Sequence, residues 1–101
     1  MSKKMSKSEK TKIYSECISR WGVPAQTLMV VEELAELTFT ISKYYRSQAT
    51  AEDIAGEIAD CRIMIDQLMY ITGITEEQVD GKEKEKMERL KRRIKKARDK
   101  Q

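Results

Sequence analysis

The sequence contains no histidine and only two cysteines. Without histidine, a zinc site of the usual kind is nearly excluded. The two thiols, Cys17 and Cys61, do not form a CxxC motif. We therefore expect two buried, reduced side chains in a reducing compartment, rather than a disulfide framework or a thiolate metal site.

Proline, glycine and aromatic residues are also scarce, with one Pro, four Gly and six aromatics among 101 residues. Together with 37% charged residues, this composition favours a helical domain over a sheet. No apolar run is long enough to span a membrane, and no apolar segment follows the basic start MSKKMSKSEK, as a signal peptide would require. We therefore expect a cytoplasmic protein that does not associate with membranes.

Apolar periodicity and capping residues predict four helices, over about residues 8–21, 24–46, 51–72 and 76–97. The helix boundaries rest on a few local signals. These signals are Gly22 and Gly73 as breaks, Pro24 in a first turn, Thr50 as an N-cap, Asp53 in the turn after it, and Thr75 with Gln78 as a capping box.

Short connections between these helices imply antiparallel neighbours. The predicted fold is all-α, an antiparallel bundle of about four helices. Because a chain of this length has a modest core, we expect homo-oligomerisation, as a dimer or a tetramer, to complete the fold. The expected organisation is a disordered basic arm over residues 1–7, a single domain over residues 8–98 and a frayed tail over residues 99–101.

Acidic residues stand inside the apolar stretch VVEELAELTFTI of residues 30–41. At about 100° per residue, Glu33 lies within the apolar stripe of its helix and Glu36 lies on the border of that stripe. The next helix repeats the arrangement with Glu57 and Asp60. Residues three apart are neighbours on a helix surface, so four carboxylates converge if the two helices pack antiparallel.

Converging carboxylates repel one another, and few bases lie nearby to compensate them. One of these bases, Arg62, is expected to pair with Asp66 at the i, i+4 spacing on another side of the helix. A hard cation is the economical solution, because Mg²⁺ or Mn²⁺ prefers oxygen ligands and often binds substrate phosphates as well. A ferritin-like di-iron centre needs histidine, so phosphate chemistry is favoured. The competing interpretation of each acid pair is an ordinary solvated helix face.

Around these acids the sequence resembles a known family. The pattern Glu32-Glu33-x-x-Glu36, followed by Glu57-x-x-Asp60, is similar to the EExxE…ExxD signature of the MazG-like all-α nucleoside triphosphate pyrophosphohydrolases. The stretches RWGVPAQTLMVVEELAELTFTISKYYR, EDIAGEIADCRIMIDQL and KEKEKMERLKRRI also resemble that family. The resemblance covers roughly residues 13–94.

The resemblance implies an enzyme that uses Mg²⁺ to cleave a nucleoside triphosphate to the monophosphate and pyrophosphate. It implies that the metal ligands are Glu33, Glu36, Glu57 and Asp60. Glu32 and Glu33 are the candidate catalytic residues, with Glu32 as a base-like or supporting carboxylate. The chain departs from the family at Leu90, where many members carry an asparagine, and this departure bears on the sugar and phosphate contacts.

Five further residues are candidates for substrate binding. Lys86, Arg89 and Arg93 flank an apolar stripe on the last predicted helix and are placed to reach phosphates from the same or a neighbouring subunit. Trp21 is a candidate for stacking on a base, and Gln26 for hydrogen bonding to a base or sugar. The competing interpretations are a solvated basic helix for the three bases and a packing anchor for Trp21.

A second functional class remains open from the sequence. A basic last helix and a basic amino-terminal arm are compatible with a non-catalytic helical protein that binds a partner or a nucleic acid. Aromatic residues do not alternate with the basic cluster, and no nucleic-acid reading motif is evident. Nucleic acid is therefore the less favoured partner.

Overall fold

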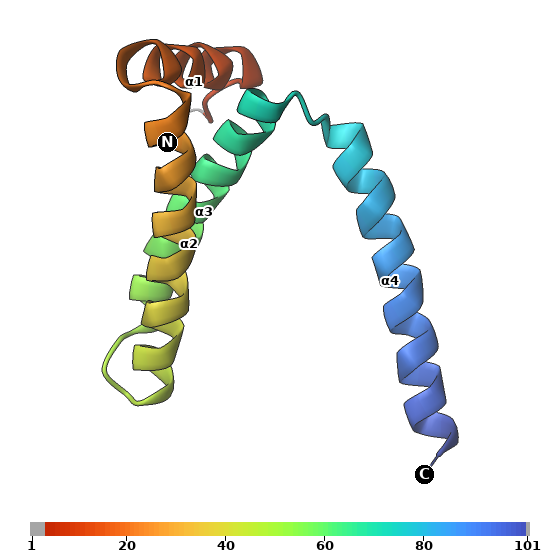
Figure 1. The fold of residues 1–101 in the computed structure, drawn as a ribbon. Helices are drawn as coiled ribbons and strands as arrows, with labels where there is room; N and C mark the ends of the chain where they lie inside the picture. Colours follow the sequence, from red (N-terminus) through yellow and green to blue (C-terminus); the bar gives the residue numbers. More distant parts are fainter. Residues whose placement is uncertain (1–3, 101) are drawn as a thin grey trace.

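The computed structural model describes residues 4–100, and these residues form four α-helices and no strand. In chain order they are α1 (Lys7–Trp21), α2 (Val23–Tyr45), α3 (Ala51–Thr72) and α4 (Glu76–Asp99) (Figure 1). The all-α prediction is confirmed, and each boundary lies within two residues of its predicted position. Of the expected basic arm, residues 1–3 lie outside the described residues, and Lys7 already belongs to α1.

Side-chain caps fix the helix starts. Ser6 begins α1 by accepting a hydrogen bond from the backbone N–H of Glu9. Thr50 and Asp53 form a reciprocal capping box at α3, in which the backbone N–H of Thr50 donates to Asp53 Oδ2 at 2.8 Å. Thr75 and Gln78 form the same arrangement at α4. These short-range bonds satisfy N–H groups that a helix start leaves free.

Two glycines end helices by adopting positive φ angles. Gly22 follows α1 with φ 87°, and its N–H donates to the carbonyl of Ile18. Gly73 follows α3 in the left-handed region with φ 74°. Residues with a Cβ atom adopt positive φ angles only at a cost in energy, so glycine suits these two positions. The chain changes direction at each of them.

The packed part of the molecule is an antiparallel hairpin of α2 and α3, which lie side by side (Figure 1). We call residues 23–72 the α2–α3 hairpin. Val30, Cys61 and Met64 are buried between its helices. The Cys61 thiol also donates a hydrogen bond to the carbonyl oxygen of Glu33, at 3.4 Å. This contact lies at the level where the acidic segments of α2 and α3 face each other.

Helix α1 crosses one end of the hairpin (Figure 1) and is anchored there by Tyr14. The Tyr14 side chain is buried, and its hydroxyl donates to Asp66 Oδ2 at 3.2 Å. Burial, together with the negative charge of Asp66, raises the pKa of Tyr14. The predicted Arg62–Asp66 ion pair is not among the ion pairs of residues 4–100. Tyr14, which is distant in sequence, forms a hydrogen bond with the Asp66 carboxylate instead.

Helix α4 stands away from the other three helices as a separate arm (Figure 1). Within the described residues, helix contacts join α1, α2 and α3 to one another and do not include α4. The radius of gyration is 17.5 Å, whereas a compact chain of this length would have about 13 Å. No helix in residues 4–100 combines the length and apolar character needed to cross a bilayer.

Candidate metal centre

Three carboxylates meet where the middle of α2 faces the first half of α3. One oxygen atom each from Glu33, Glu57 and Asp60 lies within 4.8 Å of the other two. Glu33 and Glu57 are half-buried, and Asp60 is exposed. The sequence predicted this convergence from helical periodicity, and antiparallel packing of the two helices brings it about. We call these three residues the acidic trio.

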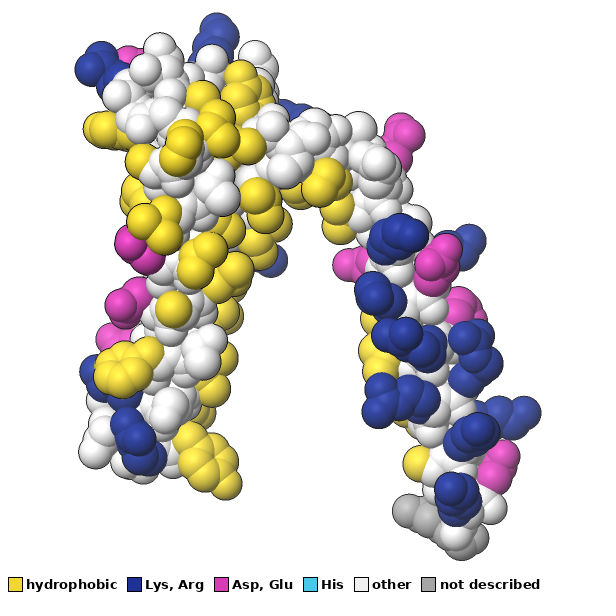
Figure 2. Space-filling model, in the orientation of Figure 1, with side chains coloured by type: hydrophobic (Ala, Val, Ile, Leu, Met, Phe, Trp, Pro, Cys, Tyr) yellow, Lys and Arg dark blue, Asp and Glu magenta, His cyan; other side chains and the backbone are white. Residues whose placement is uncertain are grey.

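The acidic trio opens into a surface cavity of about 530 Å³. Its lining includes both of the remaining motif acids, Glu32 and Glu36. Glu36, a predicted metal ligand, therefore lies at the same cavity but outside the acidic trio. Glu32 also borders the cavity, although its helical angle points further round α2. Figure 2 shows acidic side chains along the edge of the α2–α3 hairpin that faces away from α4.

Negative charge dominates the electrostatics of this site. Within residues 4–100 the ion pairs are Arg20–Glu16 and Lys91–Glu88, so no Lys or Arg forms an ion pair with the motif acids. Burial raises the pKa of the Glu33 carboxyl most. Four neighbouring carboxylates raise that pKa further, in the order Asp60, Glu57, Glu36 and Glu32.

A buried oxygen atom of Glu57 lacks a hydrogen-bond partner at this site, as does a buried oxygen atom of Gln67 further along α3. Glu57 Oε2 is inaccessible to solvent and has no hydrogen-bond partner in the protein. An unsatisfied buried carboxylate oxygen is costly, because it loses its hydration without gaining a compensating contact. A cation held by the acidic trio would remove this cost.

The acidic trio fits a hard divalent cation in its chemistry. All three donors are carboxylate oxygens, which Mg²⁺ and Mn²⁺ prefer. Octahedral ligands at about 2.0–2.1 Å from an ion are about 2.9 Å apart when adjacent and about 4.2 Å apart when opposite. The three oxygens lie within 4.8 Å of one another, so they would have to move closer together to bind a common ion.

Cys61 lies near the acidic trio and contacts the backbone of Glu33, which we did not predict from the sequence. Burial raises the pKa of its thiol, and the nearby charges of Glu33, Glu57 and Asp60 raise it further. The thiol is therefore kept protonated and donates to the Glu33 carbonyl, which leaves oxygen atoms as the cation donors. Its position four residues after Glu57 is the signal in the sequence, because such residues are neighbours on a helix.

The five predicted substrate-binding residues lie elsewhere. Lys86, Arg89 and Arg93 are on α4, which makes no contact with the α2–α3 hairpin. Trp21, at the end of α1, is 61% exposed. Gln26 is only 3% exposed, and its amide donates to the sulfur of Met29 at 3.7 Å. None of the five lines the cavity of the acidic trio.

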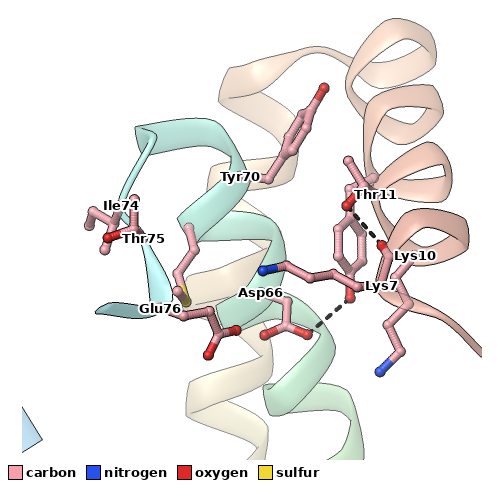
Figure 3. A pocket seen from close by; sticks show the side chains of 10 residues that line it. Lys7, Lys10, Thr11, Asp66, Tyr70, Ile74, Thr75 and Glu76 are labelled. Carbon is pink, nitrogen blue, oxygen red and sulfur yellow. Dashed lines mark hydrogen bonds between the residues drawn. The ribbon is translucent and has the colours of Figure 1, made fainter. Parts of the chain in front are cut away.

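A second surface cavity, of about 280 Å³, lies between α1, the end of α3 and the start of α4 (Figure 3). Its lining includes Lys7, Lys10, Asp66 and Tyr70. This cavity holds no group of three or more converging carboxylates like the acidic trio, so the acidic trio remains the candidate centre for chemistry.

Comparisons with known proteins supply no family for this chain. The resemblance to MazG-like pyrophosphohydrolases therefore rests on the motif residues themselves. No family model, curated protein or solved structure matches the sequence or the fold.

Proposed function

We propose that this protein is an Mg²⁺-dependent nucleoside triphosphate pyrophosphohydrolase that acts through the acidic trio. Mn²⁺ is the alternative cation. The observation that carries the proposal is the meeting of Glu33, Glu57 and Asp60, with a buried Glu57 oxygen that has no protein partner. The motif resemblance supplies the reaction, which yields a nucleoside monophosphate and pyrophosphate. Cytoplasmic localisation and homo-oligomerisation belong to the same proposal.

The charge of the site favours an anionic substrate that arrives together with cations. Three carboxylates would repel a bare triphosphate, and the site has no basic ion-pair partner to offset them. A bound divalent cation would neutralise phosphate charge and polarise the bond to be broken. The protein's contribution is then to hold the cation with Glu33, Glu57 and Asp60 and to position the substrate, which accounts for most catalysis in phosphoryl transfer.

Glu32 and Glu36 are the carboxylates that we propose to act on the attacking water. Both line the cavity of the acidic trio, and both are exposed and able to accept a hydrogen bond from solvent. A carboxylate in this position orients the water and accepts its proton as the new phosphorus–oxygen bond forms. Glu33 is the alternative proton acceptor, because it lines the same cavity.

The decisive experiment measures pyrophosphate release. The protein is incubated with a panel of ribo- and deoxyribonucleoside triphosphates and Mg²⁺. We expect turnover of at least one nucleotide, and no turnover after chelation of the cation. Failure to release pyrophosphate from any nucleotide, with Mg²⁺ or with Mn²⁺, would remove the enzymatic proposal.

The substitution Glu57→Gln tests the ligand set. It keeps the size of the side chain but removes the charge that holds the cation. We expect kcat/KM to fall by about 100-fold or more, which is the scale of losing one major electrostatic contributor. The control is Glu52→Gln on the same helix, because Glu52 is an exposed first-turn acid outside the cavity. Equal activity of the two variants would contradict the assignment of Glu57.

A second candidate function is favoured by the exposure of α4. Residues 73–101 contain eleven bases and seven acids, and α4 makes no contact with the other helices of the described chain. A nucleic acid would be held there mainly through its phosphates, with a steep dependence on salt. Binding of labelled DNA or RNA at physiological ionic strength, weakened by Arg89→Gln and Arg93→Gln but not by Glu57→Gln, would support this function.

A further inference from the structure

The isolated chain has too little core to account for its fold. Among residues 4–100, four apolar side chains are buried, those of Tyr14, Val30, Cys61 and Met64. In contrast, 21 large hydrophobic side chains are exposed. Stability of a small domain depends on apolar burial that offsets the loss of chain entropy. The missing burial must therefore come from contacts outside the single chain.

One face of the α2–α3 hairpin carries a continuous part of this exposed surface. At about 100° per residue, Leu34 and Ile41 lie about 80–100° from Glu33, in the rotational sense opposite to Glu36. On α3, Ile58 and Ile65 lie about 80–100° from Glu57, in the sense opposite to Asp60. Each of these four side chains is between 42% and 50% exposed. We call them the apolar face.

The apolar face and the acidic trio lie on opposite sides of the hairpin. Glu33 and Glu57 approach each other across the two helices. For antiparallel helices that meet in this way, equal rotation from the contact leads to the same side of the pair. The apolar face can therefore be covered completely while the cavity of the acids stays open to solvent.

Helix α4 carries a second apolar surface, narrower and also uncovered. Val79, Met87, Leu90 and Ile94 fall on one side of this helix, and each is between 43% and 55% exposed. We call them the α4 stripe. Figure 2 shows apolar side chains along both edges that border the gap between α4 and the rest of the molecule.

We propose that a second copy of this chain fills this gap, in an interlocked homodimer in which each α4 packs its stripe on the partner's apolar face. One narrow stripe cannot cover a face two helices wide, but a second copy adds its own hairpin as well as its α4. The contact is self-complementary, as a two-fold dimer requires. The apolar face and the α4 stripe have to be covered for the chain to fold. A second copy of the chain is a suitable partner, because it is present whenever the chain is made.

The lengths of α3 and α4 and the net charges of their segments also favour a second copy of the chain as the partner. The 24 residues of α4 span about 36 Å at 1.5 Å per residue, and the 22 residues of α3 span about 33 Å. Residues 25–72 contain eight acids and three bases, whereas residues 73–101 contain seven acids and eleven bases. These net charges of opposite sign attract the two segments at long range, whereas two hairpins repel each other. The contact itself is apolar, because the motif acids lie on the other side of the hairpin.

The mass of the protein in solution is the first test. Sedimentation of the full chain should give twice 11.8 kDa over a wide range of protein concentration. A folded monomer would overturn the proposal, because α4 would then have to cover its own hairpin. A protein that folds only with a different protein or with a nucleic acid would overturn it as well.

Matched substitutions test which surface holds the dimer together. Leu34→Glu on the apolar face and Leu90→Glu on the α4 stripe should each raise the dimer dissociation constant by at least 100-fold. Phe39→Glu is the control for α2, because Phe39 is 57% exposed and lies on the side of the acids. Arg92→Glu, opposite Leu90 on α4, is the second control. A dimer that withstands Leu34→Glu would contradict the assigned interface.

Cross-linking of the unchanged protein covers the case in which these variants fail to fold. Lys43 is the one lysine within residues 23–72, and α4 carries six. Chains of normal and heavy isotope composition are refolded together and treated with an amine-reactive reagent. We expect cross-links between Lys43 of one isotope and α4 lysines of the other. The reagent needs a long spacer, because Lys43 lies on the side of the acids, away from the apolar face. If all links between Lys43 and α4 stay within one isotope, the exchange of α4 is refuted.

Discussion

At the scale of the residue, two glycines with equal space around them have opposite roles. A Cβ atom built on Gly56 or on Gly73 would meet no atom within 4 Å. Gly56 lies inside α3 with ordinary helical geometry, whereas Gly73 ends α3 with φ 74°. The difference between them is therefore a difference of backbone conformation and not of packing.

This contrast gives a prediction with a built-in control. Gly56→Ala should raise the free energy of unfolding by up to about 1 kcal/mol, because alanine favours the helix. Gly73→Ala should lower it by about 1 kcal/mol or more, because the left-handed backbone is strained for alanine. Thermal melts of both variants provide the measurement. A loss of stability in Gly56→Ala would show that the backbone beside Glu57 needs glycine for another reason.

The Glu33 carboxyl predicts a dependence of stability on pH in the cation-free protein. Its pKa in the folded state lies above the ordinary 4.5, so the folded state binds this proton more tightly than the unfolded chain. The destabilisation by Glu33 is therefore fully present above the raised pKa, and it is relieved as the pH falls towards 4.5 and below. Glu33→Gln should raise the melting temperature at pH 7, and this gain should shrink on acidification.

The control for this prediction is Glu52→Gln, an exposed acid on α3 away from the acidic trio. The comparison is made in the presence of a chelator. If Glu33→Gln gave the same gain at pH 7 and at pH 4, neither burial of the ionised Glu33 carboxylate nor its repulsion by the neighbouring acids would be the cause.

At the scale of the element, α3 owes its start to a charged capping box. Hydrogen bonds from the backbone and the side chain of Thr50 lower the pKa of Asp53 below the ordinary 3.8. The carboxylate of Asp53 is used within its own helix start, where it accepts a hydrogen bond from the backbone N–H of Thr50. This local role agrees with the preference of helix N-termini for acids.

The same box predicts a stability contribution with the opposite pH dependence to that of Glu33. A lowered pKa in the folded state gives stability that is present above the ordinary pKa of 3.8. This stability is lost as the pH falls through the lowered value. Asp53→Asn should therefore melt earlier than the wild type at pH 7, and the two proteins should converge in strong acid. A constant difference at all pH values would rule out the charge as the source.

At the scale of the whole molecule, the apolar face and the acidic trio are separate features on opposite sides of the α2–α3 hairpin. This separation allows an assembly contact to form without closing the site. If both proposals hold, stability has two independent sources beyond the single chain. These would be the proposed apolar contacts between copies and the proposed cation, which would offset the repulsion among the acids.

Removal of the cation tests the second source directly. A ligand present at 100 times its dissociation constant stabilises the folded state by about 2.7 kcal/mol, which for a domain of this size corresponds to a melting temperature higher by roughly 10 °C or more. We expect Mg²⁺ to raise the melting temperature and a chelator to reverse the change. Na⁺ at matched ionic strength controls for screening, and Glu57→Gln should lose the response. An equal shift with Na⁺ would contradict specific binding.

The sequence by itself determined the helices, their ends and the acid pairs, because each depends on residues within about one helical turn. The capping residues Thr50 and Thr75, the breaks at Gly22 and Gly73, and the i, i+3 spacing of Glu33 with Glu36 and of Glu57 with Asp60 are signals of this kind. They predicted the all-α fold and the facing acids. The enzymatic function and its cation stay predictions.

Only the tertiary structure decided which acids meet and where the remaining elements lie. Helical angles predicted four converging carboxylates, but the crossing of α2 and α3 brings three within 4.8 Å. Asp66 is bound by Tyr14 of α1 and not by its neighbour in sequence, and α4 stands clear of the site that its bases were expected to reach. Contacts between distant segments depend on the relative placement of whole helices, and local periodicity carries no information about that placement.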